Sequence, residues 1–402
     1  MPQLRPLIRY LASALSLYIV LTIATPGASA KEVPVVAALC DAIEGQIGVR
    51  PAYRRVKKAK DGTITIRGLT TEVKESKAAD RKLDGTLSVE KVTLSGITQT
   101  AGGLFEVTEA TFSNVIFMGD GEEETGSALR LPEVKIERLL LGPGSTPAAT
   151  SAWILPVPVQ AQSFTTSKGM LSSGGVSLEI GSISATFSRD SESGVGRTDL
   201  RVEDVHYPAS AIRRSDPTGV VLSLFGGGDL VFDLAGTAML GPEGGVFETA
   251  LTVRSLGVVQ MTGTLAGRSP SVLASAAAAS QSDVDIPAPA ASPLMLSSIS
   301  VRYEDLSLTG KLLALLAEDL GLSREELIRN ATAAVEASLG AANENLPAQL
   351  AEAIAAYLAE PRSFTISTQP EQPVPIEVFI NNAAEGPAGL LARYPASIAV
   401  ND

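Results

Sequence analysis

The pattern that most restricts how this chain can fold is an apolar alternation that slips by one residue. The stretch LSVEKVTLSGI begins at Leu87 and has the order Φ-x-Φ-x-x-Φ-x-Φ, where Φ is an apolar residue. Further stretches repeat the order in full or in part, and they begin at Ile64, Phe105, Leu129, Leu178, Leu200, Leu251 and Leu294. This recurrence indicates one structural element that is used many times.

The order excludes a helix and favours a bent strand. On a helix the four apolar positions would point at about 0°, 200°, 140° and 340°, so they would share no face. In a flat strand the x-x step would turn the second apolar pair to the opposite face. A β-bulge absorbs one residue, returns both pairs to one face and bends the strand. The intervening residues are mostly polar, as at Ser88, Glu90 and Lys91.

Short turn-rich segments, such as 100–103 and 142–145, separate the copies and suit antiparallel neighbours. We therefore predict an α+β fold that is mainly β. It has a long, curved antiparallel β-meander of repeated bulged strands, followed by a small helical C-terminal subdomain. A right-handed β-solenoid is the alternative, and the unequal spacing of the copies counts against it.

The predicted domains follow the changes in pattern along the chain. We expect a signal peptide at 1–30, an N-terminal helix and basic linker at 31–60, and the β-sheet repeat domain at 61–302. The small-residue tract at 269–293 is expected to be a flexible excursion from that sheet. The helical C-terminal subdomain at 303–402 is expected to contain one or two strands, and Ser323 with Glu326 predicts a capping box.

The first thirty residues predict export to the periplasm. Arg5 and Arg9 precede an uncharged apolar stretch that ends in Ala28-Ser29-Ala30, which is the order of a secretory signal peptide. An uncleaved inner-membrane anchor is the less favoured alternative, because about 20 uncharged residues can span a bilayer. The one cysteine, Cys40, excludes an intrachain disulfide and is expected to be buried.

The sequence predicts no catalytic residue, no metal ligand set and no cofactor. His206 is the one histidine, it occupies a polar position of a repeat copy, and no G-x-S-x-G motif supplies a nucleophile. The net charge of −12 argues against nucleic acid as a partner. We therefore expect a protein that is not an enzyme.

Two groups of residues are candidate binding sites. The aliphatic face of the strands is expected to form an apolar groove. Its predicted lining is Leu87, Val89, Val92, Leu94, Phe105, Val107, Phe112, Leu129, Leu131, Val134, Ile136, Ile180, Ile183, Val202, Val205, Leu251, Val253 and Leu256. A basic cluster is expected either to contact anionic lipid or a partner, or to be a solvated linker. Its members are Arg50, Arg54, Arg55, Lys57, Lys58 and Lys60.

The export signal and the run of one-sided amphipathic strands over residues 60–300 resemble the AsmA/TamB-type periplasmic β-repeat proteins of Gram-negative bacteria, or a related proteobacterial envelope family. That resemblance implies a groove of aliphatic side chains that holds or passes phospholipid acyl chains. We therefore expect a non-enzymatic periplasmic envelope protein that binds or transfers phospholipid or another envelope lipid. The alternative is a structural or assembly factor that acts on an envelope protein through an edge strand. The position of the C-terminal helices distinguishes these two functions, since the groove stays open only if the helices cap one end of it.

Overall fold

The computed structural model describes most of the chain after residue 32. The described residues are 33–47, 49–73, 85–119, 127–142, 161–190, 192–193, 195–216, 219–241, 243–267, 295–339, 346–375, 378–379 and 393–402. The predicted signal peptide at 1–30 and the predicted excursion at 269–293 lie outside them.

The chain divides into two compact units. Unit 1 comprises Met1–Pro208 and Ser269–Ala291, and unit 2 comprises Ala209–Arg268 and Ser292–Asp402. This division falls inside the predicted 61–302 domain, and it groups the C-terminal helices with the strands that precede them.

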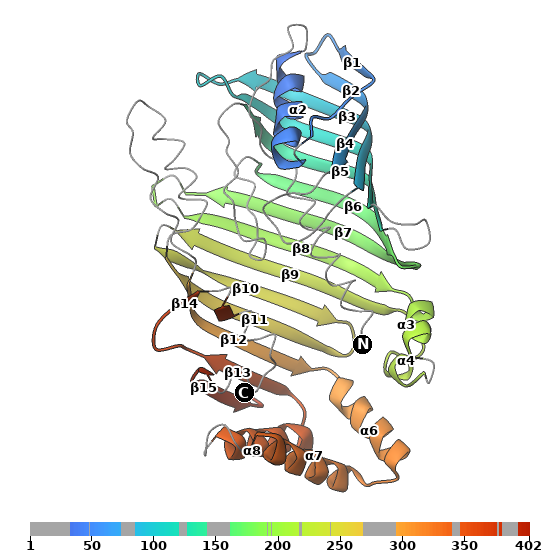
Figure 1. The fold of residues 1–402 in the computed structure, drawn as a ribbon, viewed down its shortest axis with the longest axis vertical. Coiled ribbons are helices and arrows are strands. Elements are labelled where there is room, and N and C mark those ends of the chain that lie inside the picture. The colour runs from blue at the N-terminus through green and yellow to red at the C-terminus, as the bar shows by residue number, and fades with distance from the viewer. Residues whose placement is uncertain are drawn as a thin grey trace. The chain divides into compact units, whose positions relative to one another are not determined.

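Unit 1 contains a helix and an antiparallel meander in which each strand pairs with the next one along the chain (Figure 1). Its elements are α2 (Pro34–Ile47), β1 (Arg55–Lys58), β2 (Ile64–Val73), β3 (Gly85–Gln99), β4 (Phe105–Gly119), β5 (Ala128–Leu141), β6 (Ser163–Ser173), β7 (Val176–Arg189) and β8 (Gly196–Tyr207). The N-terminal helix is confirmed. The linker interpretation of the basic segment is wrong for Arg55–Lys58, which form the first strand.

Unit 2 is also antiparallel, with the strand order β9-β10-β11-β12-β13-β15 and with β14 paired to β12. Its strands are β9 (Leu230–Gly241), β10 (Gly244–Val253), β11 (Gly257–Ala266), β12 (Met295–Asp305), β13 (Ser363–Thr368), β14 (Val374–Pro375) and β15 (Ala396–Val400). Its helices are α3 (Ala209–Ser215), α4 (Val220–Leu224), α6 (Leu308–Leu320), α7 (Arg324–Leu339) and α8 (Leu346–Ala359). The predicted fold class, mainly antiparallel β with C-terminal helices, is confirmed.

The helix ends follow the chemistry that the sequence predicts. Gly321 closes α6 in the left-handed conformation, with φ 63°. The capping box before α7 is formed, since the amide of Ser323 donates to Glu326 Oε2 at 2.9 Å and the amide of Glu326 donates to Ser323 Oγ at 3.2 Å. Figure 1 shows α8 beside β15, and α6 running from the end of β12 to α7.

In unit 1 the slipped residues of neighbouring strands stand opposite one another. Arg67 pairs with Lys91 and Leu69 with Val89, so Gly68 lies opposite Glu90 without a shift in register. The same arrangement continues from strand to strand through β8. We call these residues the slip row, and they are Gly68, Glu90, Asn114, Pro132, Lys168, Gly181 and Asp204.

Every second member of the slip row has a left-handed backbone. Gly68, Asn114, Lys168 and Asp204 have φ between 51° and 64°, and they lie on β2, β4, β6 and β8. Glycine and asparagine adopt this conformation most readily, and it reverses the alternation of a strand by one step. Both apolar pairs therefore return to one face, as predicted. Neither strand of a pair has an extra residue, because the slipped residues lie opposite one another and the register is kept.

Two copies in unit 2 use other devices. The copy that begins at Leu251 is a hairpin and not one bent strand, because β10 ends at Val253 and β11 begins at its partner Gly257. Ser255 in the connecting turn has φ 62°, which suits a three-residue hairpin loop. The copy at Leu294 contains a true bulge, since Ser298 pairs with Thr264 and Leu296 with Leu265, which leaves Ser297 as the extra residue.

Candidate functional site

The predicted groove residues of unit 1 do share one face, and that face is buried by the chain itself. Only Phe105 among them is half-buried, and the others are 0–7% exposed. Helix α2 supplies part of the cover, because Val36, Leu39 and Cys40 have no exposed surface and the helix lies against the curled strands β1–β5 (Figure 1). In unit 1 this face is a packed core.

The predicted groove residues of unit 2 have three different environments. Leu251 is 37% exposed, Val253 is half-buried and Leu256 is 3% exposed. Leu256 lies in the β10–β11 turn. Its carbonyl oxygen accepts hydrogen bonds from the amides of Leu306, Ser307 and Leu308 at 2.9, 3.1 and 3.2 Å, so it anchors the start of α6.

The register of unit 2 brings a broader apolar surface together around Leu251. Leu251 pairs with Leu234 on β9 and with Val259 on β11, while Met261 pairs with Val301 on β12 and Val301 with Ile366 on β13. Paired residues of antiparallel strands project to the same side of the sheet. We call this surface the unit 2 apolar face, and it comprises Leu234, Leu251, Val259, Met261, Val301 and Ile366.

The unit 2 apolar face differs from the face in unit 1 because it is partly exposed. Val259 and Val301 are each 40% exposed and Leu251 is 37% exposed, on three adjacent strands. The prediction missed Val259 and Val301 as lining residues. Their alternation is visible in the sequence, but only the register shows that they adjoin Leu251.

An aromatic cluster packs the helices against one end of this face. The Tyr357 ring of α8 lies edge-on to Tyr303 of β12 and to Phe364 of β13, with ring centroids 6.3 and 5.7 Å apart. Tyr303 pairs with Val259, so the cluster adjoins the unit 2 apolar face directly. The helices thus pack at one end of the face and leave Leu251, Val259 and Val301 partly exposed.

Polar groups inside this cluster satisfy one another. The Tyr357 and Thr309 hydroxyls lie 2.6 Å apart, and Asp305 Oδ1 accepts from the Tyr303 hydroxyl and from the amide of Thr309, both at 2.8 Å. Asp305 thus satisfies one amide in the first turn of α6. Burial, followed by the contact with Asp305, raises the pKa of Tyr303, and burial also raises the pKa of Tyr357.

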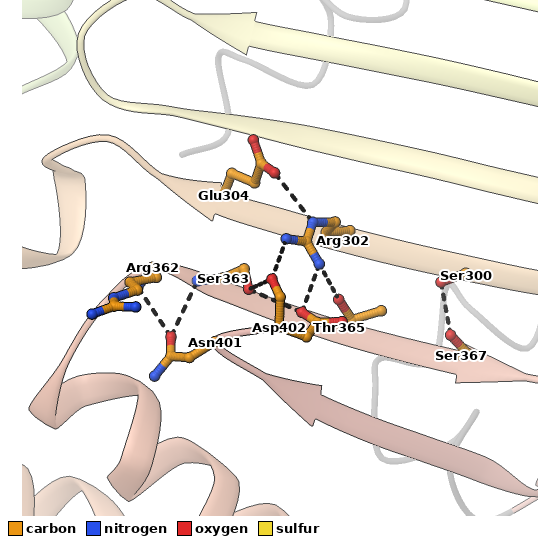
Figure 2. Close-up of polar contacts among 9 residues, drawn as sticks. All are labelled: Ser300, Arg302, Glu304, Arg362, Ser363, Thr365, Ser367, Asn401 and Asp402. Carbon is orange, nitrogen blue, oxygen red and sulfur yellow. Dashed lines mark hydrogen bonds and ion pairs between the residues drawn. The ribbon is translucent and has the colours of Figure 1, made fainter.

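On the opposite face of β12 and β13, polar side chains hold the last two residues of the sequence (Figure 2). Arg302 donates from Nη1 to Asp402 Oδ1 at 2.6 Å and from Nη2 to the Asp402 carbonyl oxygen at 2.8 Å. Ser363 Oγ donates to Asp402 Oδ1 at 3.0 Å, and Asn401 Oδ1 accepts from the amides of Arg362 and Ser363. The Ser363 hydroxyl and then Arg302 lower the pKa of Asp402. This network fastens β12, β13 and the residues after β15 together.

The predicted basic cluster is divided by the structure. Arg50 is engaged by α2, because its Nη1 donates to the carboxylate of Asp41 and lies 3.4 Å from Glu44 Oε2. The aliphatic part of Arg54 lies over Gly68. Arg55, Lys57 and Lys58 lie on β1 and, like Arg54 and Lys60, they are exposed.

The described residues lack two other kinds of site. They contain no group of three or more His, Cys, Asp or Glu side chains placed to hold a metal ion. In that same part of the chain, no helix has the length and apolar character needed to cross a bilayer. His206 is half-buried on β8 and pairs with Glu179 of β7.

A comparison with protein-family models found a match. Residues 250–401 match a protein-family model whose description is an uncharacterized protein. A search of curated proteins found no match. The matched segment includes the aromatic cluster, the Arg302 network except Asp402, and every member of the unit 2 apolar face except Leu234.

Proposed function

We propose that this protein is a non-catalytic envelope protein that binds lipid, and that an acyl chain lies on the unit 2 apolar face. One observation carries the proposal: Leu251, Val259 and Val301 remain 37–40% exposed on an otherwise continuous apolar surface. Exposed apolar surface of this kind is typical of a site that a ligand or a partner covers.

The dimensions of the face suit an acyl chain. Neighbouring strands lie about 4.8 Å apart, so the three strands that hold Leu251, Val259 and Val301 span about 10 Å. The hydrocarbon core of a bilayer is about 30 Å thick, so one acyl chain occupies about 15 Å of it. A single chain would therefore cover these three strands and reach Leu234 on β9.

The position of the helices supports the same proposal. The aromatic cluster of Tyr303, Tyr357 and Phe364 fixes α8 at one end of the face. If the helices lay along the whole face, Val259 and Val301 would be as buried as the equivalent residues of unit 1. Aliphatic side chains without a convergent set of polar groups suit a ligand that is recognised by its hydrocarbon part.

Native mass spectrometry with lipid extraction tests this proposal. The protein is purified from a Gram-negative periplasm, because the predicted signal peptide at 1–30 and the AsmA/TamB-type resemblance support export to that compartment. We expect phospholipid at near-stoichiometric mass. An unliganded mass that stays unchanged after incubation with phosphatidylethanolamine would refute lipid binding.

A matched pair of variants locates the site. Val259→Asp places a charge on the apolar face, while Val246→Asp places the same charge on the opposite face of the same sheet, where Val246 is 48% exposed. A carboxylate in contact with hydrocarbon is strongly unfavourable. We expect Val259→Asp to lower the fraction of lipid-bound protein at least about tenfold, and Val246→Asp to leave it unchanged. Equal losses of bound lipid in the two variants would show that the lipid does not bind at this face.

A second candidate function is assembly through protein contacts, and one observation favours it. Leu312, Leu316 and Leu320 follow one another at four-residue spacing along α6, and they are 39%, 38% and 56% exposed. An exposed leucine stripe on a helix suits a groove on a protein partner. Crosslinking in the periplasm that depends on Leu316, in protein without bound lipid, would favour this candidate over the first.

A further inference from the structure

A row of like charges crosses three neighbouring strands on the polar face of unit 1. Arg55 of β1 pairs with Arg67 of β2, and Arg67 pairs with Lys91 of β3. Lys57 lies two residues from Arg55 and therefore projects to the same face. We call these four residues the cationic row: Arg55, Lys57, Arg67 and Lys91.

None of the four forms an ion pair with another described residue. Arg55, Lys57 and Arg67 are exposed, and Lys91 is half-buried. Of the carboxylates beside the row, Glu90 is next to Lys91 and accepts a hydrogen bond from Asn114. Glu133 is separated from Lys91 by Ser113 and is paired with Lys135 at 3.7 Å. The row is thus a local positive surface on a chain whose net charge is −12.

Such a row is unfavourable for folding by itself. Directly opposed residues in antiparallel strands have Cβ atoms about 5 Å apart, and like charges at that distance repel. Protection of a sheet edge explains cations on β1, because lysine and arginine on an edge strand discourage pairing with another chain. It does not explain Arg67 and Lys91, since β2 and β3 each have a neighbour on both sides.

We propose that the cationic row is a docking surface for an anionic lipid membrane. Arg55, Arg67 and Lys91 lie on a line about 10 Å long across the sheet face, since it crosses two strand spacings of about 4.8 Å, and Lys57 lies about 7 Å to one side along β1. This spread suits a surface of many headgroups better than one phosphate, which would need the side chains to converge. Lysine and arginine also keep their charges in water while their stems rest on the sheet.

The proposal changes the membership of the basic site. Arg50, predicted from the sequence, is held by acidic residues of α2, whereas Arg67 and Lys91 come from separate segments and join Arg55 and Lys57 only through strand pairing. It does not rest on lipid binding by unit 2, because different residues are involved and a bilayer surface is contacted in place of a single acyl chain.

Sedimentation with vesicles tests the proposal on the full purified protein. The probe is phosphatidylcholine vesicles with and without phosphatidylglycerol, at low and high salt. We expect binding only to the anionic vesicles, and we expect high salt to weaken it. The double variant Arg67→Gln, Lys91→Gln should bind about thirtyfold more weakly, because each cation near an anionic membrane contributes about a factor of five.

A matched control keeps the change of net charge constant. Lys135→Gln with Arg201→Gln removes two cations from the same face of unit 1, outside the cationic row. We expect this control to bind within about twofold of the parent, and we attribute that small difference to the change in net charge. Equal losses in both double variants would overturn the proposal, as would an absence of binding by the parent protein.

Two further arms separate other sources of negative charge. If inorganic phosphate displaces the protein from the vesicles more strongly than chloride does at equal ionic strength, the row is a site for a single phosphate and the membrane proposal is wrong. If the protein binds polyglutamate but not anionic vesicles, and the double variant Arg67→Gln, Lys91→Gln loses that binding, the partner is an acidic protein and the membrane proposal is wrong. Circular dichroism of each variant shows whether a loss of binding reflects a loss of fold.

Discussion

The hydroxyl of Tyr357 lies 2.6 Å from the hydroxyl of Thr309, and this buried contact joins α8 to α6 beside the unit 2 apolar face. Tyr357 is 8% exposed and Thr309 is 9% exposed, so neither hydroxyl has easy access to water. The pair therefore marks the boundary between the part of the apolar face that the helices cover and the part that stays exposed.

Removal of the Tyr357 ring should loosen this end of unit 2. We expect Tyr357→Ala to lower the free energy of unfolding by about 3–5 kcal/mol, as large aromatic truncations in cores do. Tyr357→Phe should cost about 1 kcal/mol, because Thr309 loses its hydroxyl partner. Urea unfolding followed by circular dichroism measures both, and equal effects would show that the ring itself contributes nothing.

Alkaline pH should destabilise the protein through Tyr303. Its pKa is raised above the ordinary value of 10.0, so the folded state favours the neutral phenol. The stability that this provides is fully present below pH 10 and is lost as the pH rises toward the folded-state pKa. We expect the urea midpoint to fall as the pH rises above 10, and to fall less in Tyr303→Phe. An identical fall in that variant would contradict the assignment.

Acid should weaken the Arg302 network. The pKa of Asp402 is lowered from the ordinary value of 3.8, so its contribution is present above that value and is lost as the pH falls below it. Asp402→Asn should therefore lower the urea midpoint at pH 7, and the difference from the parent should shrink by pH 3. Asp319→Asn, which alters an exposed carboxylate of α6, is the control and should show no such convergence.

The slip row predicts which residues Asn114 can be exchanged for. Asn114 has φ 51°, a conformation that β-branched residues strongly disfavour. We expect Asn114→Val to lower the free energy of unfolding by about 2 kcal/mol. Asn114→Gly should cost less, because it relieves the backbone but loses the hydrogen bond from Asn114 to Glu90. Ser113→Val, one residue away on the same strand, should be tolerated.

The cationic row predicts a variant that gains stability. Arg67 faces a cation on each side, so Arg67→Thr removes two repulsive pairs and places a β-branched residue in a strand. We expect a gain of about 0.5–1 kcal/mol at low salt, and a smaller gain at high salt. A loss of stability would mean that Arg67 has an attractive role in the fold.

Several features of the fold could be predicted from single stretches of sequence. The slip at Glu90 and Lys91 identified a bent strand, because alternation is a property of one strand alone. The helix ends at Gly321 and at Ser323 were equally local, since capping depends on residues within one turn. Each of these predictions needed no knowledge of a partner strand.

Other features depended on register, which a single sequence does not reveal. The opposition of Arg67 to Lys91 and the exposure of Val259 beside Leu251 arise only from pairing between strands. The copy at Leu251 was misinterpreted because a three-residue hairpin loop and a bend have the same apolar spacing. The burial of the predicted groove residues in unit 1 depends on what the rest of the chain places over them, which periodicity does not report.

The alternation of left-handed residues along the slip row also defines the smallest module from which such a sheet can be extended. Gly68, Asn114, Lys168 and Asp204 lie on every second strand, each opposite a residue of ordinary conformation such as Glu90. A duplicated single strand would set two left-handed residues, or none, side by side. Gene duplication that lengthens this sheet must therefore add strands in pairs, and a chimera with an odd insertion should break the row at the junction.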